Sequence, residues 1–453
     1  FYTKSLYQHV KHLITRFYRL HEDRDPDWDR IKILHSWGGS FVDGFYSHAC
    51  KLLGTVPITY GQASALAPNR PFEFVCERLL AQTNISPIFD YVFVDEAQDF
   101  PPEFMRLALK LANQERLVIA YDVLQTIFDV ETPTAGSLFG LDEANEPAIA
   151  FDEDIVLHKC YRNPREILIC AHAIGFGIYG PRILQMLESK EHWEDFGYKV
   201  VQGNFVSGEH VKIERSRENS PSSISDNNSP AEILQARSFA SAGEEVLSIA
   251  AAIKEDISVG GVLPEDILVI SADDRNARFY FRKLAEALGA LNIPINNLQD
   301  DSYGIREFKS EGKVTTATVY KAKGNEAYIV YLIGIDYVFQ KNSPRFRNMA
   351  FTAMTRAKGW LRVSGVGPAA DACVAELNAA KAKLPFLEFV FPSPEQLLVM
   401  KRDLVQVDLE EADATLAKLA EDMSDEELEL LLAKKLREVR ARSATKKFGR
   451  PKR

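Results

Sequence analysis

An acidic cluster follows a short apolar run near residue 90. The stretch YVFVDEAQDF, residues 91–100, reads as a buried strand that ends in Asp95, Glu96 and Asp99, with Gln98 between them. Carboxylates at the end of a strand can hold Mg²⁺ and activate a water molecule. Asp95 is placed to bind the metal, directly or through water, and Glu96 to orient and deprotonate the water. The alternative is a solvated loop, which a fully apolar strand before the cluster and a double proline after it disfavour.

Two further segments could act on a phosphate. In YDVLQTIFD, residues 121–129, Gln125 could sense a γ-phosphate or the attacking water, although a surface turn is the ordinary alternative. In FTAMTRAKGWL, residues 351–361, Arg356 lies near the end of an expected helical run. An arginine placed against a phosphate acts as an arginine finger. The alternative for Arg356 is a solvated charge on a helix.

A third segment could bind a nucleobase. LHKCYRNPREI, residues 157–167, places Tyr161 and Arg162 just before an expected helix. The tyrosine ring can stack on a base and the arginine can reach a phosphate. For this segment taken alone, a helix start with a core tyrosine is the favoured interpretation.

A fourth segment combines glycine with charge. TVYKAKGNEA, residues 318–327, holds Gly324, which permits a close backbone approach. Lys321 and Lys323 supply positive charge, and Glu326 can accept a hydrogen bond from a hydroxyl group. A charged β-turn is the alternative.

The elements that must position these residues indicate an α/β fold. In the first 150 residues we expect strands at 31–37, 91–96 and 116–122 and a helix at 101–112. Further on we expect helices at 164–179, 243–257 and 277–291 and a flexible loop or insertion at 210–232. We expect a strand at 266–273, two strands within 313–336 around a tight polar turn, and a last, short strand at 361–367. Alternating strands and helices predict parallel sheets with functional groups at strand ends.

Composition excludes several classes of protein. The 453 residues are 46% hydrophobic and 26% charged, with a net charge of −10, so any nucleic-acid surface must be a local patch. The cysteines show no CxxC spacing, which predicts reduced core residues in a cytoplasmic protein and disfavours zinc. They are Cys50, Cys76, Cys160, Cys170 and Cys373. No apolar run approaches the roughly 20 residues of a membrane span, and no signal peptide is apparent.

The C-terminal part, from residue 393, has a different character. It contains a predicted helix, SDEELELLLAKKLREVRARS, with a capping box from Ser424 to Glu427. From Lys434 onward there are ten lysines and arginines and one acid. The terminal FGRPKR resembles an AT-hook core, but a basic tail that contacts phosphates non-specifically is the favoured interpretation.

Together the segments resemble the UvrD/Rep-type superfamily 1 DNA helicases over residues 1–367. VDEAQD looks like motif II, YDVLQTIFD like motif III, YRN like motif IV, TVYKAKGNEA like motif V and FTAMTRAKGWL like motif VI; FYTKS, residues 1–5, is similar to motif Ia, and ILHSWG, residues 33–38, to a downstream motif that touches DNA. Motifs II, V and VI are highly specific as a set, whereas Ia and III are looser.

The resemblance implies a role for each matching residue. The implied cofactors are ATP and Mg²⁺. For catalysis it implies that Glu96 is the general base, that Gln125 couples the γ-phosphate to DNA, that Arg356 contacts the γ-phosphate and that Asp95 binds Mg²⁺. For nucleotide binding it implies that Tyr161 stacks on adenine, that Arg162 contacts the γ-phosphate and that Glu326 binds the ribose, with Gly324 in the same loop. The residues implied to contact DNA are Tyr2, Thr3, His35, Thr318 and Lys321. Tyr320 departs from the family, which has histidine there.

The family fold is two RecA-like lobes. We therefore expect a first lobe at 1–150 that is N-terminally incomplete, a second lobe at 151–392 with a reduced insertion around 205–310, and a helical, basic tail at 393–453. The implied activity is an ATP-dependent DNA helicase or translocase on single-stranded or partly duplex DNA, moving 3′ to 5′, in repair, recombination or phage defence. A protein partner or a nuclease-related module upstream, as in some bacterial relatives, is also implied.

The phosphate loop of such enzymes is missing from this sequence. No G-x-x-x-x-G-K-[ST] occurs, and the motif Ia-like stretch is already residue 1. The simplest expectation is that the loop lies upstream of Phe1, so that this chain alone binds ATP poorly and hydrolyses little. The alternatives are a non-hydrolysing DNA-binding scaffold subunit with a vestigial ATP site and an RNA helicase of the same superfamily.

Overall fold

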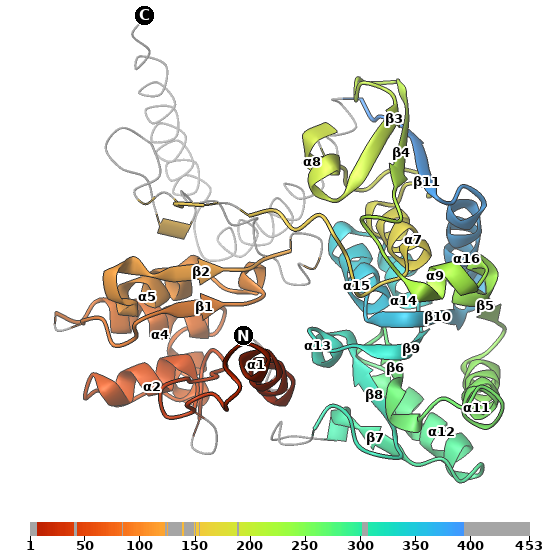
Figure 1. Ribbon diagram of the computed structural model, residues 1–453. Coiled ribbons are helices and arrows are strands. Elements are labelled where there is room, and N and C mark those ends of the chain that lie inside the picture. Colours follow the sequence, from red (N-terminus) through yellow and green to blue (C-terminus); the bar gives the residue numbers. More distant parts are fainter. Residues whose placement is uncertain are drawn as a thin grey trace, which may run out of the picture. The chain divides into compact units, whose positions relative to one another are not determined.

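The computed structural model describes residues 7–39, 43–83, 85–122, 125, 138–139, 149, 151–153, 155–187, 190–300 and 307–393 (Figure 1). The chain divides into two units, 1–391 and 392–453, and the elements below belong to the first. The helix and capping box expected in the tail lie outside the described residues.

The first part of the chain packs helices around a two-stranded parallel sheet. Its elements are α1 (Tyr7–Glu22), α2 (Phe45–Leu52), α3 (Tyr60–Leu66), α4 (Pro71–Leu80), β1 (Val92–Val94), the 3₁₀ helix η2 (Ala97–Asp99), α5 (Pro102–Leu111), the 3₁₀ helix η3 (Asn113–Glu115) and β2 (Leu117–Ile119). The expected strands at 91–96 and 116–122 and the helix between them are confirmed, with shorter bounds. Proline at the first position of α5 starts that helix without losing a backbone bond.

The strand expected at 31–37 is wrong. This segment is extended, but only His35 forms a bridge, to Gly44. Its carbonyl groups instead accept hydrogen bonds from the first turn of α2: Phe45 N donates to His35 O at 2.7 Å and Ser47 N to Trp37 O at 3.0 Å. The first N–H groups of a helix lack partners within it. The apolar pattern therefore marks a segment that caps a helix.

The second part of the chain holds the larger sheet. Its elements are α7 (Arg165–Phe176), α8 (Lys190–Asp195), β3 (Tyr198–Gln202), β4 (His210–Arg215), α9 (Ser223–Asn227), α10 (Pro230–Ile233), β5 (Leu234–Phe239), α11 (Ala242–Ser258), the 3₁₀ helix η5 (Pro264–Asp266), β6 (Ile267–Ser271), α12 (Ala277–Gly289), β7 (Ile295–Asn297), the 3₁₀ helix η6 (Leu298–Asp300), β8 (Val314–Thr318), α13 (Val319–Ala322), β9 (Ala327–Ile333), α14 (Asp336–Lys341), α15 (Pro344–Met354), β10 (Ala357–Val366), α16 (Gly367–Ala382) and β11 (Phe386–Val390). The strand order is β5-β10-β9-β6-β8-β7, all parallel, and β11-β4-β3 form a separate antiparallel sheet.

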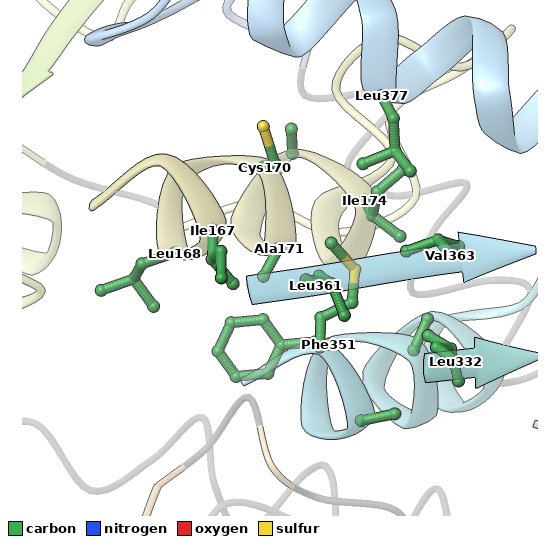
Figure 2. Close-up of a cluster of buried hydrophobic side chains, with 14 of the residues drawn as sticks. Ile167, Leu168, Cys170, Ala171, Ile174, Leu332, Phe351, Leu361, Val363 and Leu377 are labelled. Atoms are coloured by element: carbon green, nitrogen blue, oxygen red, sulfur yellow. The ribbon is translucent and has the colours of Figure 1, made fainter. Parts of the chain in front are cut away.

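Helices cover both faces of the six-stranded sheet. Along β9, Val330 and Leu332 pack into the cluster built by α7, α15 and α16, whereas Ile329 and Tyr331 pack into the cluster of α11 and α12. Figure 2 shows the first cluster, where side chains of α7 lie against Leu361 of β10. Successive residues of a strand point to opposite faces, so a sheet buried on both sides has nearly continuous apolar strands. The protein is thus a mixed α/β structure with parallel sheets flanked by helices.

The flexible loop expected at 210–232 is also wrong. Val211 and Ile213 of β4 are fully buried, and β4 pairs with both β3 and β11. The polar residues that suggested disorder cap short helices instead, since Ser229 N donates to Glu232 at 2.7 Å at the start of α10. Buried and outward-facing residues alternate along β4, but the charged residues on its outer face hid this period in the sequence.

Four other features differ from expectation. The strands β8 and β9 lie on either side of β6 and are joined through α13, so they form no tight turn. The helical run expected at 351–361 ends at Met354, and β10 starts at Ala357. The strand expected at 361–367 is β10, which is longer than predicted. It is not the last strand, because β11 comes after it in the chain. The segment 205–310 supplies β5, β6 and β7 to the large sheet, so the expected insertion is not separate from it.

Within the described part of the chain, no helix is both long enough and apolar enough to cross a membrane.

Candidate functional site

The acidic cluster follows β1 in a constrained turn. Glu96 has φ +55°, a left-handed conformation that is uncommon for residues other than glycine. Gln98, which is buried, donates from Nε2 to Glu96 Oε2 at 2.6 Å. Asp95 is exposed, yet partial removal from water and the neighbouring Glu96 raise the pKa of its carboxyl group. Glu96 is therefore held in one position, while Asp95 stays accessible.

The end of β2 is joined to this cluster by hydrogen bonds. Because β1 and β2 are parallel, their carboxyl ends lie at the same edge, with Val94 opposite Ile119. Asp122 N donates to Gln98 Oε1 at 3.1 Å, and Gln125 Nε2 donates to Asp122 Oδ2 at 2.7 Å. Two sequence motifs that lie some 30 residues apart thus form one polar network.

Two cations from the six-stranded part reach the same network. Lys323, 3% exposed, donates to Asp99 Oδ1 and Oδ2 at 2.8 and 2.7 Å and to Gln125 O at 2.7 Å. Arg356, 1% exposed, donates from Nη2 to Gln125 Oε1 at 2.5 Å and from Nε to Thr352 O at 2.9 Å. The structure thus brings three predicted site residues, Glu96, Gln125 and Arg356, into one neighbourhood.

The Arg356 guanidinium is only partly satisfied. Its Nη1 is buried and has no hydrogen-bond partner among the residues that the structure describes. Burial, and then repulsion from Arg162, lower the pKa of Arg356 to about 10, while Glu96 and Asp122 act in the opposite direction. A buried, unpaired donor on a cation is costly unless a ligand satisfies it. The arrangement suits an anion beside Gln125.

Tyr161, Arg162 and Glu326 lie together at the edge of this neighbourhood. Arg162 Nε donates to Glu326 Oε2 at 2.9 Å, and Lys358 Nζ lies 3.0 Å from Glu326 Oε1. Burial alone would raise the pKa of Glu326, but the hydrogen bond from Lys358 and the charge of Arg162 outweigh it and lower that pKa. Tyr161 is 75% exposed, so its ring face is open to a flat partner.

The structure describes three of the residues predicted to contact DNA, and the contacts below are local to each of them. His35 Nε2 accepts from Gly38 N at 3.0 Å, and Thr318 is buried at the end of β8. Lys321 Nζ donates to Leu298 O. Tyr2 and Thr3 lie outside the described residues.

Sequence reasoning missed several residues that hold the site. The sequence identified Lys323 only as one of two positive charges, because its burial depends on the tertiary structure. Asn163, buried, donates from Nδ2 to Thr355 O at 2.9 Å and to Ala357 O at 2.7 Å, and so fixes the turn on both sides of Arg356. Its position in YRN was the only available signal. Gly324 has φ +80°, a left-handed conformation that favours glycine, while the close backbone approach expected there stays a prediction.

Comparison with known proteins supports a helicase segment. Residues 313–364 match the UvrD-like helicase C-terminal domain family. This segment carries Lys323, Glu326 and Arg356, and the match agrees with the UvrD-like part of the expected family for these residues alone. It is a small part of the chain, and the subgroup with a nuclease-related domain stays a prediction.

Two further comparisons add little. No curated protein matches the chain. A similar solved structure is the C-terminal domain of a possible DNA helicase from Lactobacillus plantarum WCFS1, with 14% identity over 49% of this chain and 96% of that one and a TM-score of 0.26. At that TM-score the likeness supports no argument about fold or function.

Proposed function

We propose that the chain is the core of a UvrD/Rep-type DNA helicase or translocase that uses ATP and Mg²⁺ to move 3′ to 5′ along single-stranded DNA, in repair, recombination or phage defence. Its two parallel sheets would be the two RecA-like lobes. The family match at 313–364 supports the helicase class. The ATP-dependent activity rests on the geometry below.

One observation carries the proposal. Arg356 presents a buried Nη1 that no described residue bonds, and its Nη2 holds Gln125 beside the carboxylates that follow β1. A guanidinium in this state fits a phosphoryl group, whereas the buried Arg347 donates from Nε, Nη1 and Nη2 to Asn342 and Glu376. A phosphate there would lie between groups from both sheets.

The other residues fit the remaining parts of an ATP–Mg²⁺ complex. Asp95 is an accessible carboxylate, and Mg²⁺ commonly takes one or two carboxylates together with phosphate oxygens and waters. Among the described residues, no group of three or more Asp, Glu, His or Cys side chains could hold a metal ion. A Mg²⁺ ion at Asp95 would therefore take phosphate oxygens and waters as its further ligands. The exposed ring of Tyr161 suits a base, and Glu326 suits the ribose hydroxyl groups.

The chemistry follows from how these residues are held. ATP supplies the phosphoanhydride bond that is broken. Glu96, oriented by Gln98, accepts a proton from water. Arg356 neutralises charge that develops on the phosphoryl oxygens. Gln125, which contacts groups from both sheets, reports the state of the phosphate to the second sheet.

The test is Glu96→Gln in the intact gene product. Glutamine keeps an oxygen for the Gln98 hydrogen bond but cannot take a proton. We expect DNA-stimulated phosphate release to fall at least about 100-fold, while the affinity for single-stranded DNA changes less than about twofold. Glu286→Gln, at an exposed position on α12, is the matched control and should leave both unchanged.

Two results would reassign the protein. If the unsubstituted protein binds DNA but releases no phosphate, the non-hydrolysing scaffold replaces the helicase. If single-stranded RNA stimulates hydrolysis more than DNA of the same sequence, the substrate class changes to RNA. The intact gene product is used because the G-x-x-x-x-G-K-[ST] pattern of a phosphate loop does not occur in these 453 residues.

A further inference from the structure

The buried lysine after α13 has no role in the function proposed above. Lys323 ends α13, where its N donates to Val319 O at 3.0 Å, and Gly324 with φ +80° then turns the chain. The ammonium has three protons, and three acceptors lie within hydrogen-bond distance: both carboxylate oxygens of Asp99 and the carbonyl oxygen of Gln125. Its hydrogen-bonding capacity is therefore fully used within the protein.

The bonds of Lys323 join segments that are far apart in sequence. Asp99 belongs to η2 after β1, and Gln125 follows β2, whereas Lys323 connects β8 to β9. A fourth group, Glu96 Oε2, lies 3.4 Å from the same Nζ. One side chain of the six-stranded part thus meets the acidic turn and the glutamine segment simultaneously.

Gln125 is held from two sides by this arrangement. Lys323 binds its backbone carbonyl at 2.7 Å, and Arg356 binds its side-chain oxygen at 2.5 Å. The backbone bond sets where the residue sits, and the side-chain bond sets where its amide points. If Lys323 were absent, Arg356 would still hold the amide, but the backbone that carries it would lose its anchor to the second sheet.

We propose that Lys323 is a positioning residue for ATP hydrolysis, which fixes Glu96 and Gln125 relative to each other and to Arg356. This inference rests on the proposed function. Lys323 does not touch the nucleotide; it acts through Asp99 and Gln125. Since a small misplacement of reacting groups lowers the rate strongly while leaving binding intact, loss of Lys323 should affect kcat and not KM.

A purely structural role for Lys323 predicts a different outcome, and a double variant separates the two. Lys323→Met alone leaves Asp99 as a buried carboxylate without its cation, which destabilises the protein whatever the role of the lysine. Adding Asp99→Asn removes that buried charge. The double variant should therefore recover folding, but it cannot restore the bond to Gln125 O or the contact with Glu96.

The measurement is steady-state, DNA-stimulated phosphate release by the intact gene product, with thermal unfolding and binding of a fluorescent ATP analogue on the same samples. For the double variant we expect a melting temperature near that of the unsubstituted protein, a KM within about threefold, and a kcat lowered at least about tenfold. The control is Lys309→Met with Asp266→Asn, a surface lysine–aspartate pair at 2.8 Å, which should leave kcat unchanged.

Each outcome decides the inference. If kcat returns to the unsubstituted value together with stability, Lys323 only joins the two parts and the positioning role is overturned. If kcat stays low and KM rises in proportion to a loss of analogue binding, Lys323 serves nucleotide binding and the inference is again overturned. If the unsubstituted protein does not hydrolyse ATP at all, the proposed function fails first, and this role fails with it.

Discussion

Two arginines with the same burial should respond in opposite ways to the same substitution. Arg347 and Arg356 are both 1% exposed. Arg347 donates to Glu376 Oε2 at 2.6 Å and Oε1 at 2.9 Å, and to Asn342 Oδ1. Among the described residues, Arg356 has no carboxylate as an ion-pair partner and leaves Nη1 unpaired. We predict that Arg347 stabilises the fold and that Arg356 serves the phosphate.

The magnitudes follow from these contacts. Arg347→Met leaves Glu376, 5% exposed, without its cation, which should cost about 3–5 kcal/mol of unfolding free energy. Arg356→Met removes an unpaired buried donor, a gain of about 1–3 kcal/mol, and loses the bonds to Thr352 O and Gln125 Oε1, each about 0.5–1.5 kcal/mol. The expected net change for Arg356→Met is therefore small, within about 2 kcal/mol.

Catalysis should show the reverse order. Loss of an arginine at a transferred phosphoryl group lowers the rate by about 10³–10⁵-fold, so Arg356→Met should nearly abolish phosphate release by the intact gene product. Arg347→Met should leave the rate per folded molecule unchanged at a temperature where it remains folded. Urea unfolding followed by circular dichroism gives the stability, and DNA-stimulated phosphate release gives the rate. The reasoning is refuted if Arg356→Met loses more than about 3 kcal/mol while its folded fraction hydrolyses ATP normally.

Three other predictions can be checked with the same assays. Tyr161→Ala should raise KM for ATP several-fold without lowering the melting temperature, because the ring is 75% exposed. His172 is fully enclosed, bonds Tyr198 Oη at 2.8 Å, and burial followed by Arg215 lowers its pKa well below 6.5. Below pH 6.5 the unfolded chain therefore binds a proton at His172 that the folded chain does not bind, and the free energy of unfolding should fall by up to about 1.4 kcal/mol per pH unit. If the free energy of unfolding of His172→Gln falls equally steeply between pH 6.5 and 5, this explanation is wrong. Deletion of 445–453 should weaken DNA binding and reduce its dependence on salt, and unchanged binding at low salt would dismiss any role of the tail in DNA contact.

Local sequence was sufficient where one element has one clear period. The helices α5, α11 and α12 have apolar residues on one face, and β6 is a continuous apolar run, so spacing alone located them. Prediction failed at 31–37 and 210–232. In both, the backbone groups find partners that come from elsewhere in the chain, and neither composition nor period reports such partners.

The sequence by itself determined which residue types could do chemistry: Asp95 and Glu96 after an apolar strand, Gly324 between charged residues, and a set of motifs resembling one helicase family. Only the tertiary structure decided which of them meet. Lys323 enters the cluster at Asp99, 224 positions away in sequence, and Arg356 reaches Gln125 from 231 positions away. A local pattern sets the period of a helix or strand, because its cause lies within a few neighbouring residues. Which charges become buried together, and which donor is left without a partner, depends on how whole sheets and helices pack, and no short stretch of sequence carries that information.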